Sequence, residues 1–257
     1  MKEQNKIPSY VRLYRQDLAA DLLKLSSLLE KFYLNTGEIR KAASQLKSES
    51  VFKINPSDEV DYTMIGYHIS EIEINFSELP NHTYPENIED LTLKFDIKLL
   101  TNYEKEYSHK DPLRHLEFNI VVTGYIGDKE HIISYHLDRH PESENETEEA
   151  HPKYHFQFGG RKLDKTNKEF GQSIILDSPR IMHYPMDLIL GVDFIVSNFF
   201  PEIWCQLKKE NDYVSLVRDC KDKYLKPYFA SITGHWMGLL NGKSTWSDIE
   251  ICPQLYK

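Results

Sequence analysis

Residues 91–99 read Leu-Thr-Leu-Lys-Phe-Asp-Ile-Lys-Leu, an unbroken alternation of apolar with polar or charged side chains. Successive side chains of a β-strand point to opposite faces, so this stretch predicts a strand with one buried and one solvated face. Such strands are typical of antiparallel sheets, because parallel sheets are usually covered on both faces. The stretch therefore predicts an antiparallel sheet.

Further strand patterns lie on both sides of this stretch. Residues 65–69 and 72–76 alternate on opposite parities, which indicates either a bulge near Ser70-Glu71 or two separate strands. Gly127-Asp128 predicts a turn between two later strands. The remaining strands are expected at residues 116–126, 132–138, 155–158 and 173–176, which gives a meander of five or six strands.

A helical pattern precedes the strands. Residues 9–33 contain no Gly or Pro, and apolar residues recur at helical spacing at Leu18, Leu22, Leu25, Leu29 and Phe32. These residues form one apolar stripe on a helix. A second helix is expected after Thr36, a suitable N-cap residue, and completes a helical hairpin within residues 1–47. The stripe either packs on the chain's own sheet or contacts another chain, including a second copy of this one.

The most apolar stretch, residues 186–200, predicts a buried helix after the strands. It includes Asp187 and Asp193 and is shorter than the ~20 apolar residues that a bilayer span needs, so we expect no membrane insertion. A carboxylate such as Asp193 in an apolar helix needs a partner, and we expect a hydrogen bond to Arg180, a Tyr or a Trp. The tail, residues 233–257, holds Trp236 and is expected to pack against the rest of the protein.

The order of helices, then strands, then helices indicates an α+β fold. We expect one domain over residues 1–257, with a helical segment at 1–47, a β-sheet region at 62–177 and a helical region at 185–257. This order resembles the layout of ubiquitin-conjugating and RWD domains. Residues 174–200 lie where that family keeps its active cysteine, but the first cysteine here is Cys205, so the resemblance carries over no active-site residue.

Composition narrows the possible functions. The formal net charge of -9 at pH 7 argues against broad capture of nucleic acid, because neutralised phosphates supply most of the affinity of duplex binders. Only a local group of basic residues offers such a surface: Arg161, Lys162, Lys165 and Lys168.

The three cysteines, Cys205, Cys220 and Cys252, show no Cys-x-x-Cys spacing. Together with their odd number, this spacing indicates reduced thiols and a cytoplasmic location. Cys205 lies next to Trp204 in a helical pattern, and we expect it in the core.

Histidines are concentrated around the predicted strand at 132–138. His136 and Asp138 project to one face of that strand, and His140 continues the same parity. His155 reaches the same face if its strand pairs with this one, and His151 could join them if its loop folds back. Imidazoles plus a carboxylate are the ligand set of a Zn, Mn or Fe site.

The same pattern has a simpler interpretation as a polar sheet face. Half-exposed strands accept His and Asp on their solvated side, and the spacing from His136 to His140 matches no established metal motif. On this interpretation His136 and His155 lie on the wetter face, where their imidazoles could also give a response to pH.

A second group of polar residues lies around 177–187, where Pro179 and Pro185 punctuate a loop before a helix start. Free backbone N–H groups at a helix start can hold an anion, and Arg161, Arg180 and His183 are the candidate anion-binding residues. The alternative is a buried network in which Arg180 pairs with Asp177 or Asp187. Asp193 and His183 are the candidate acid–base residues.

The sequence supports a non-catalytic role best, as an interaction protein or accessory subunit of a larger cytoplasmic assembly. We expect its partner, another protein or a second copy, to bind the N-terminal helices. A metal-dependent hydrolase using the His/Asp group is the alternative, and a nucleic-acid-associated protein is the second alternative.

Overall fold

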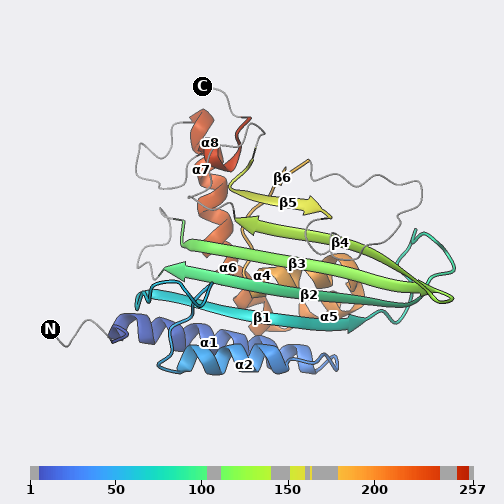
Figure 1. Cartoon of the computed structure of the whole chain (residues 1–257), viewed down its shortest axis with the longest axis horizontal. Coiled ribbons are helices and arrows are strands. Elements are labelled where there is room, and N and C mark those ends of the chain that lie inside the picture. Colours follow the sequence, from blue (N-terminus) through green and yellow to red (C-terminus); the bar gives the residue numbers. More distant parts are fainter. Residues whose placement is uncertain are drawn as a thin grey trace.

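The computed structural model describes residues 6–102, 111–139, 151–159, 163, 179–237 and 248–254 (Figure 1). Two helices come first, α1 (Ser9–Glu30) and α2 (Gly37–Lys47). The strands are β1 (Met64–Asn75), β2 (Glu89–Asn102), β3 (Leu113–Ile126), β4 (Lys129–Arg139), β5 (Tyr154–Phe158) and β6 (Ile181–Met182). The later helices are α4 (Leu188–Phe199), α5 (Pro201–Leu207), α6 (Asn211–Cys220), the π-helical η2 (Lys221–Leu225), α7 (Lys226–Met237) and α8 (Asp248–Ile251).

The six strands form one antiparallel sheet in the order β1-β2-β3-β4-β5-β6, so the predicted α+β meander is confirmed. The register of β1 against β2 shifts between Ile69 and Ile72, which confirms the predicted bulge. β6 lies where the sequence predicted a loop, and it pairs with β5 over two residues only. The strand expected at 173–176 lies outside the described residues.

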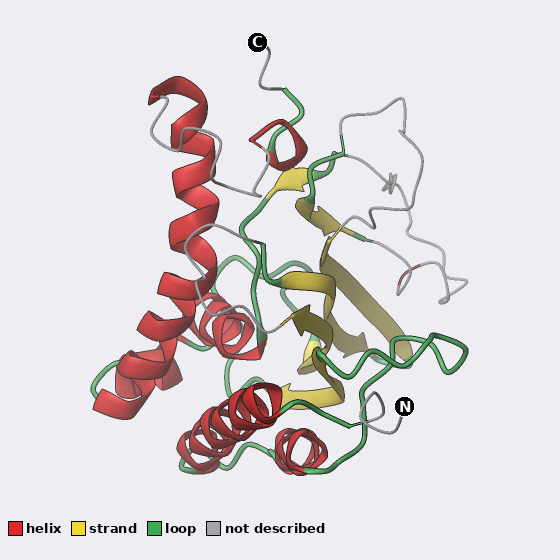
Figure 2. Ribbon diagram, turned by 90° about the vertical axis from the view of Figure 1, so that its left-hand side faces the viewer, coloured by secondary structure: helices red, strands yellow, loops and turns green. Residues whose placement is uncertain are grey.

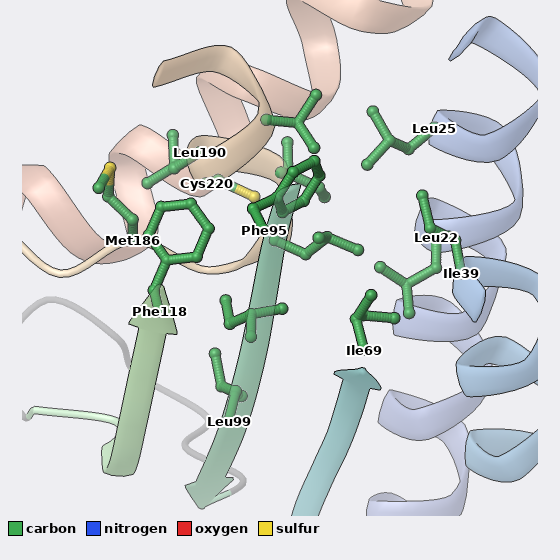
Figure 3. Close-up of a cluster of buried hydrophobic side chains, with 14 of the residues drawn as sticks. Leu22, Leu25, Ile39, Ile69, Phe95, Leu99, Phe118, Met186, Leu190 and Cys220 are labelled. Carbon is green, nitrogen blue, oxygen red and sulfur yellow. The ribbon is translucent and has the colours of Figure 1, made fainter. Parts of the chain in front are cut away.

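The core fills one side of the sheet. Alternate residues of β2 and β3, such as Phe95 and Phe118, are almost fully buried and meet edge to face at 6.2 Å between ring centroids. Leu190 of α4 and Leu22 of α1 join them from the covering helices (Figure 3). Figure 2 shows the helices gathered along this side and along the β1 edge of the sheet. None of the described helices has both the length and the apolar character needed to cross a bilayer.

The apolar stripe of α1 packs within its own chain. Leu22, Leu25 and Leu29 are at most 2 % exposed and lie in the same core as β1. Arg15, on the same helix, ties α1 to the end of α2, because its guanidinium donates to the carbonyl oxygens of Leu46 at 2.9 Å, Gln45 at 3.0 Å and Ser50 at 2.8 Å. The N-terminal hairpin is therefore part of the fold.

Thr36 precedes α2 as predicted, but its hydroxyl does not cap that helix. It donates to Glu30 Oε1 at 2.6 Å and accepts from Ser26 Oγ at 2.8 Å. Asn35 Oδ1 instead accepts from the backbone N–H of Gly37 at 3.0 Å. The threonine thus fastens the loop to the end of α1.

One prediction about the C-terminal part is wrong, and a second is confirmed only in part. Cys205 is exposed, because α5 is short and buries only Leu207. The tail packs against the protein at α8, where Ile251 is fully buried in the core. Trp236 and Met237 are 68 % and 67 % exposed, because the end of α7 extends beyond the sheet (Figure 1). The start of α4 behaves as expected for a capped helix, since Asp187 Oδ1 accepts from the backbone N–H of Leu190 at 3.0 Å.

The packing of α1 gives a matched test. Leu22→Ala removes a fully buried side chain and should lower the free energy of unfolding by ~2–5 kcal/mol. Leu13→Ala makes the same change on the same helix at a residue that is 62 % exposed, and its effect should stay within ~0.5 kcal/mol. Urea denaturation followed by circular dichroism measures both, and equal effects would show that the stripe is not packed in the core.

Candidate metal centre

The register of β3, β4 and β5 brings the predicted His/Asp group together. Asp138 on β4 lies opposite His155 on β5, and His136 lies opposite Gln157 on β5 and Asn119 on β3. Because side chains alternate along each strand, these residues share the sheet face that is opposite the helix-covered core. The pairing that the sequence left open is therefore confirmed.

The three side chains approach within the dimensions of a metal site. The Nε2 atom of His155 lies 2.8 Å from Oδ1 of Asp138, and Nε2 of His136 lies 3.7 Å from Oδ2 of Asp138. One ligand atom from each of the three residues lies within 4.8 Å of the others. Within the described part of the chain, no other group of three or more His, Cys, Asp or Glu residues brings its ligand atoms this close together.

The site is more enclosed than a polar sheet face. The side chain of His155 is 3 % exposed, that of His136 is 16 % exposed and that of Asp138 is 35 % exposed. The expectation that both histidines lie on the wetter face is wrong for His155. The segment before β5 covers it: the ring of His151 contacts the ring of His155 with 4.6 Å between centroids, and the carbonyl of Pro152 lies beside it.

Burial and charge act in opposite directions on Asp138. Burial by itself would raise the pKa of its carboxyl group. The hydrogen bond from His155 and the charges of His155, His136 and His151 outweigh that effect, so the pKa of Asp138 is lowered. The carboxylate is thus held in its charged form, which is the form that binds a metal.

Each ring nitrogen of His155 faces an oxygen atom that can accept a hydrogen bond. Its Nδ1 donates to the carbonyl oxygen of Pro152 at 3.3 Å, while Nε2 faces Asp138. Metal-bound histidines usually donate their second N–H to a carbonyl or carboxylate, which fixes the ring and its tautomer. The contact with Pro152 fixes His155 in this way and leaves Nε2 directed into the site.

A buried ion pair on the opposite face holds the next pair of residues in register. Arg139 lies opposite Tyr154, and both bind Asp111: Arg139 Nε at 3.3 Å and the Tyr154 hydroxyl at 2.6 Å. Lys153 adds an ion pair of 2.7 Å to Glu250 near the C-terminus. The sequence did not reveal this network, because Asp111 is 28 residues from Arg139 and 43 residues from Tyr154 along the chain and lies in no recognisable local pattern.

Some predicted site residues cannot be placed. His140 and Arg161 lie outside the described residues, as do Asp177 and the basic residues 162, 165 and 168. Arg180 lies directly before β6. The carboxylate of Asp187, one of its predicted partners, accepts from the backbone of Leu190 and from Cys220 Sγ at 3.2 Å.

His183 is enclosed by aromatic rings. Its ring centroid lies 4.1 Å from that of Tyr184 and 5.6 Å from that of Phe156, and its Nδ1 donates to the carbonyl of Tyr184 at 2.7 Å. Burial lowers its pKa, and the hydrogen bond to Tyr184 opposes this only in part. The neutral ring is suited to packing and is a poor anion ligand.

Asp193 of α4 contacts side chains from three other helices, α5, α6 and η2. Its Oδ1 accepts from Trp204 Nε1 at 3.1 Å and from the Tyr213 hydroxyl at 2.9 Å, and its Oδ2 lies 3.7 Å from Lys221 Nζ. Burial, together with the charge of Asp193, raises the pKa of Tyr213. The predicted hydrogen bonds to a Tyr and a Trp are confirmed. They give the carboxylate of Asp193 a structural role in holding these helices together.

No protein-family model, curated protein or solved structure matches this chain. The resemblance to the ubiquitin-conjugating layout therefore gains no support from them.

The enclosure of His183 has a consequence for pH dependence. Its folded pKa lies below the ordinary value of 6.5, so the unfolded state takes up a proton first as the pH falls. Wild-type stability should therefore drop from about pH 6.5 downward until the folded pKa is reached. His183→Gln removes this loss. Its free energy of unfolding relative to that of the wild type, measured by urea denaturation, should therefore rise as the pH is lowered from about 7.5 to about 5.5. A difference that does not change with pH would contradict the enclosure.

Proposed function

We propose that this chain binds one divalent transition metal ion, Zn²⁺ in the first instance, through His136, Asp138 and His155. The convergence of these three ligand atoms carries the proposal. Ligand atoms around a tetrahedral zinc ion lie roughly 3.3–3.5 Å apart, given metal–ligand distances of about 2.0–2.2 Å. His155 Nε2 lies 2.8 Å from Oδ1 of Asp138 and His136 Nε2 lies 3.7 Å from the other carboxylate oxygen, Oδ2. A rotation of the carboxylate, together with movement of the two rings, would place one atom of each residue around the ion.

The chemistry of the donors supports the same proposal. Two imidazoles and a carboxylate suit Zn, Mn or Fe, and the low pKa of Asp138 keeps its carboxylate available. Nε2 of His155 and Oδ1 of Asp138, which lie 2.8 Å apart, are two of the atoms that the metal ion would bind. Metal affinity should accordingly fall in acid, because protons compete for the same ligand atoms.

Three protein ligands would leave a fourth position. If water took it, the metal would lower the pKa of that water toward ~7 and make a hydroxide available for hydrolysis. This is the metal-dependent hydrolase that the sequence offered as an alternative. If a protein group took it, the metal would be structural.

Metal content tests the proposal. Protein purified without a metal-affinity tag should carry about one Zn²⁺ per chain by mass spectrometry after zinc loading and desalting. His136→Ala and Asp138→Asn should each weaken zinc binding at least ~100-fold, beyond the ~10–100-fold cost of losing a group that only supports a ligand, measured by competition with a chelating dye.

His131→Ala is the matched control, because His131 lies on β4 outside the His/Asp group. It should bind zinc like the wild type. Absence of zinc from wild-type protein, or equal loss in His131→Ala, would contradict the proposed site.

A second candidate is the interaction role predicted from the sequence, as an accessory subunit of a cytoplasmic assembly. Tyr10 and Leu13 of α1 are 46 % and 62 % exposed, although the stripe beside them is occupied by the core. We propose self-association through this exposed part of α1. Reduced thiols in a cytoplasmic protein are consistent with the three free cysteines.

Sedimentation analysis tests the second candidate. The double variant Tyr10→Ser/Leu13→Ser should weaken self-association ~10-fold or more, because buried aromatic and apolar anchors supply most interface energy. Trp236→Ser, which changes an exposed aromatic residue on α7, should leave it unchanged. A wild-type protein that stays monomeric at high concentration would contradict this role.

A further inference from the structure

We infer that His151 supplies the fourth ligand of this centre, which makes it a closed, structural metal site. The inference rests on the proposed binding of a metal by His136, Asp138 and His155. In a hydrolase, water would occupy the fourth coordination position of the metal. Here His151 would occupy that position instead.

The position of His151 supports this role. Its ring lies against that of His155 at 4.6 Å between centroids and an interplanar angle of 74°. This is nearer than the ring of His136, an established member of the group, whose centroid lies 5.9 Å from that of His155. His151 therefore lies against His155 from the segment before β5, whereas His136 and Asp138 lie on β4.

Electrostatics place His151 near the same carboxylate. Burial alone would raise the pKa of Asp138, and the charge of His151 is among the effects that lower it instead. His151 is not among the residues whose ligand atoms lie within 4.8 Å of one another, so its ring has to move toward the carboxylate to bind the metal. The ligand set of three His and one Asp fills a tetrahedral zinc site completely.

The backbone at His151 is restrained. The residue before a proline is confined to extended conformations, and His151 precedes Pro152. The carbonyl of Pro152 in turn accepts from His155 Nδ1. One short segment therefore fixes the orientation of His155 through its backbone and holds the His151 ring against that of His155.

A closed centre would link β4 to the start of β5. His136 and Asp138 lie on β4, while His151 and His155 lie before and on β5. Metal bound by all four would fasten these two parts of the chain to each other and stabilise the folded state by mass action. Such a role agrees with a non-catalytic protein.

Cobalt substitution tests the inference, because Co²⁺ reports its coordination in the visible spectrum. The wild type, His151→Ala and the control His131→Ala are loaded with Co²⁺ and titrated with azide. The wild type and control should show a tetrahedral spectrum that azide does not change. His151→Ala should bind Co²⁺ at least ~100-fold more weakly, beyond the ~10–100-fold cost of losing a supporting group, and its spectrum should respond to azide.

The outcomes separate the two proposals. A wild type that binds no Co²⁺ would remove the metal site itself and this inference with it. A wild type that binds Co²⁺ with an azide-sensitive spectrum would overturn the fourth ligand alone and leave an open site for hydrolase assays. Unchanged affinity in His151→Ala would do the same. The azide response of the wild type decides the question even if the variant fails to fold.

Discussion

Strands of this sheet send alternate side chains to opposite faces, and the described helices lie along one of those faces and the β1 edge. The fully buried residues of β2 and β3, such as Phe95 and Phe118, lie on the helix-covered face, so most of the polar residues between them share the other one. A slip of one residue in the pairing of β5 with β4 would move every side chain of β5 to the opposite face of the sheet. The buried contacts of Arg139 and Tyr154 with Asp111 resist such a slip, and they thereby keep Asp138 opposite His155.

The candidate centre follows from this register and from local cover. A half-exposed sheet face usually leaves its histidines in water, but the segment before β5 encloses His155. Enclosure raises the cost of leaving polar atoms without partners, and both ring nitrogens of His155 face oxygen atoms. The arrangement is thus an enclosed polar group with the composition of a metal ligand set, and it contrasts with Asp193, whose oxygens are already bound by side chains of other helices.

The parts of the fold that depend on short-range patterns could be predicted from the sequence. Alternation located the strands, a change of its parity located the bulge after Ile69, and i,i+2 spacing placed His136 and Asp138 on one face. The enclosure of His155 could not be predicted, because it depends on a segment outside the strands. The exposure of Cys205 was missed because a helical pattern does not reveal how many faces of a short helix are covered.

Crystals of the chain grown with Zn²⁺, with diffraction data collected on both sides of the zinc absorption edge, test the central claim most directly. We expect one strong anomalous peak between β4 and β5, within bonding distance of His136, Asp138 and His155. A map with no peak there, with the imidazole of His155 still hydrogen-bonded to Asp138, would contradict it.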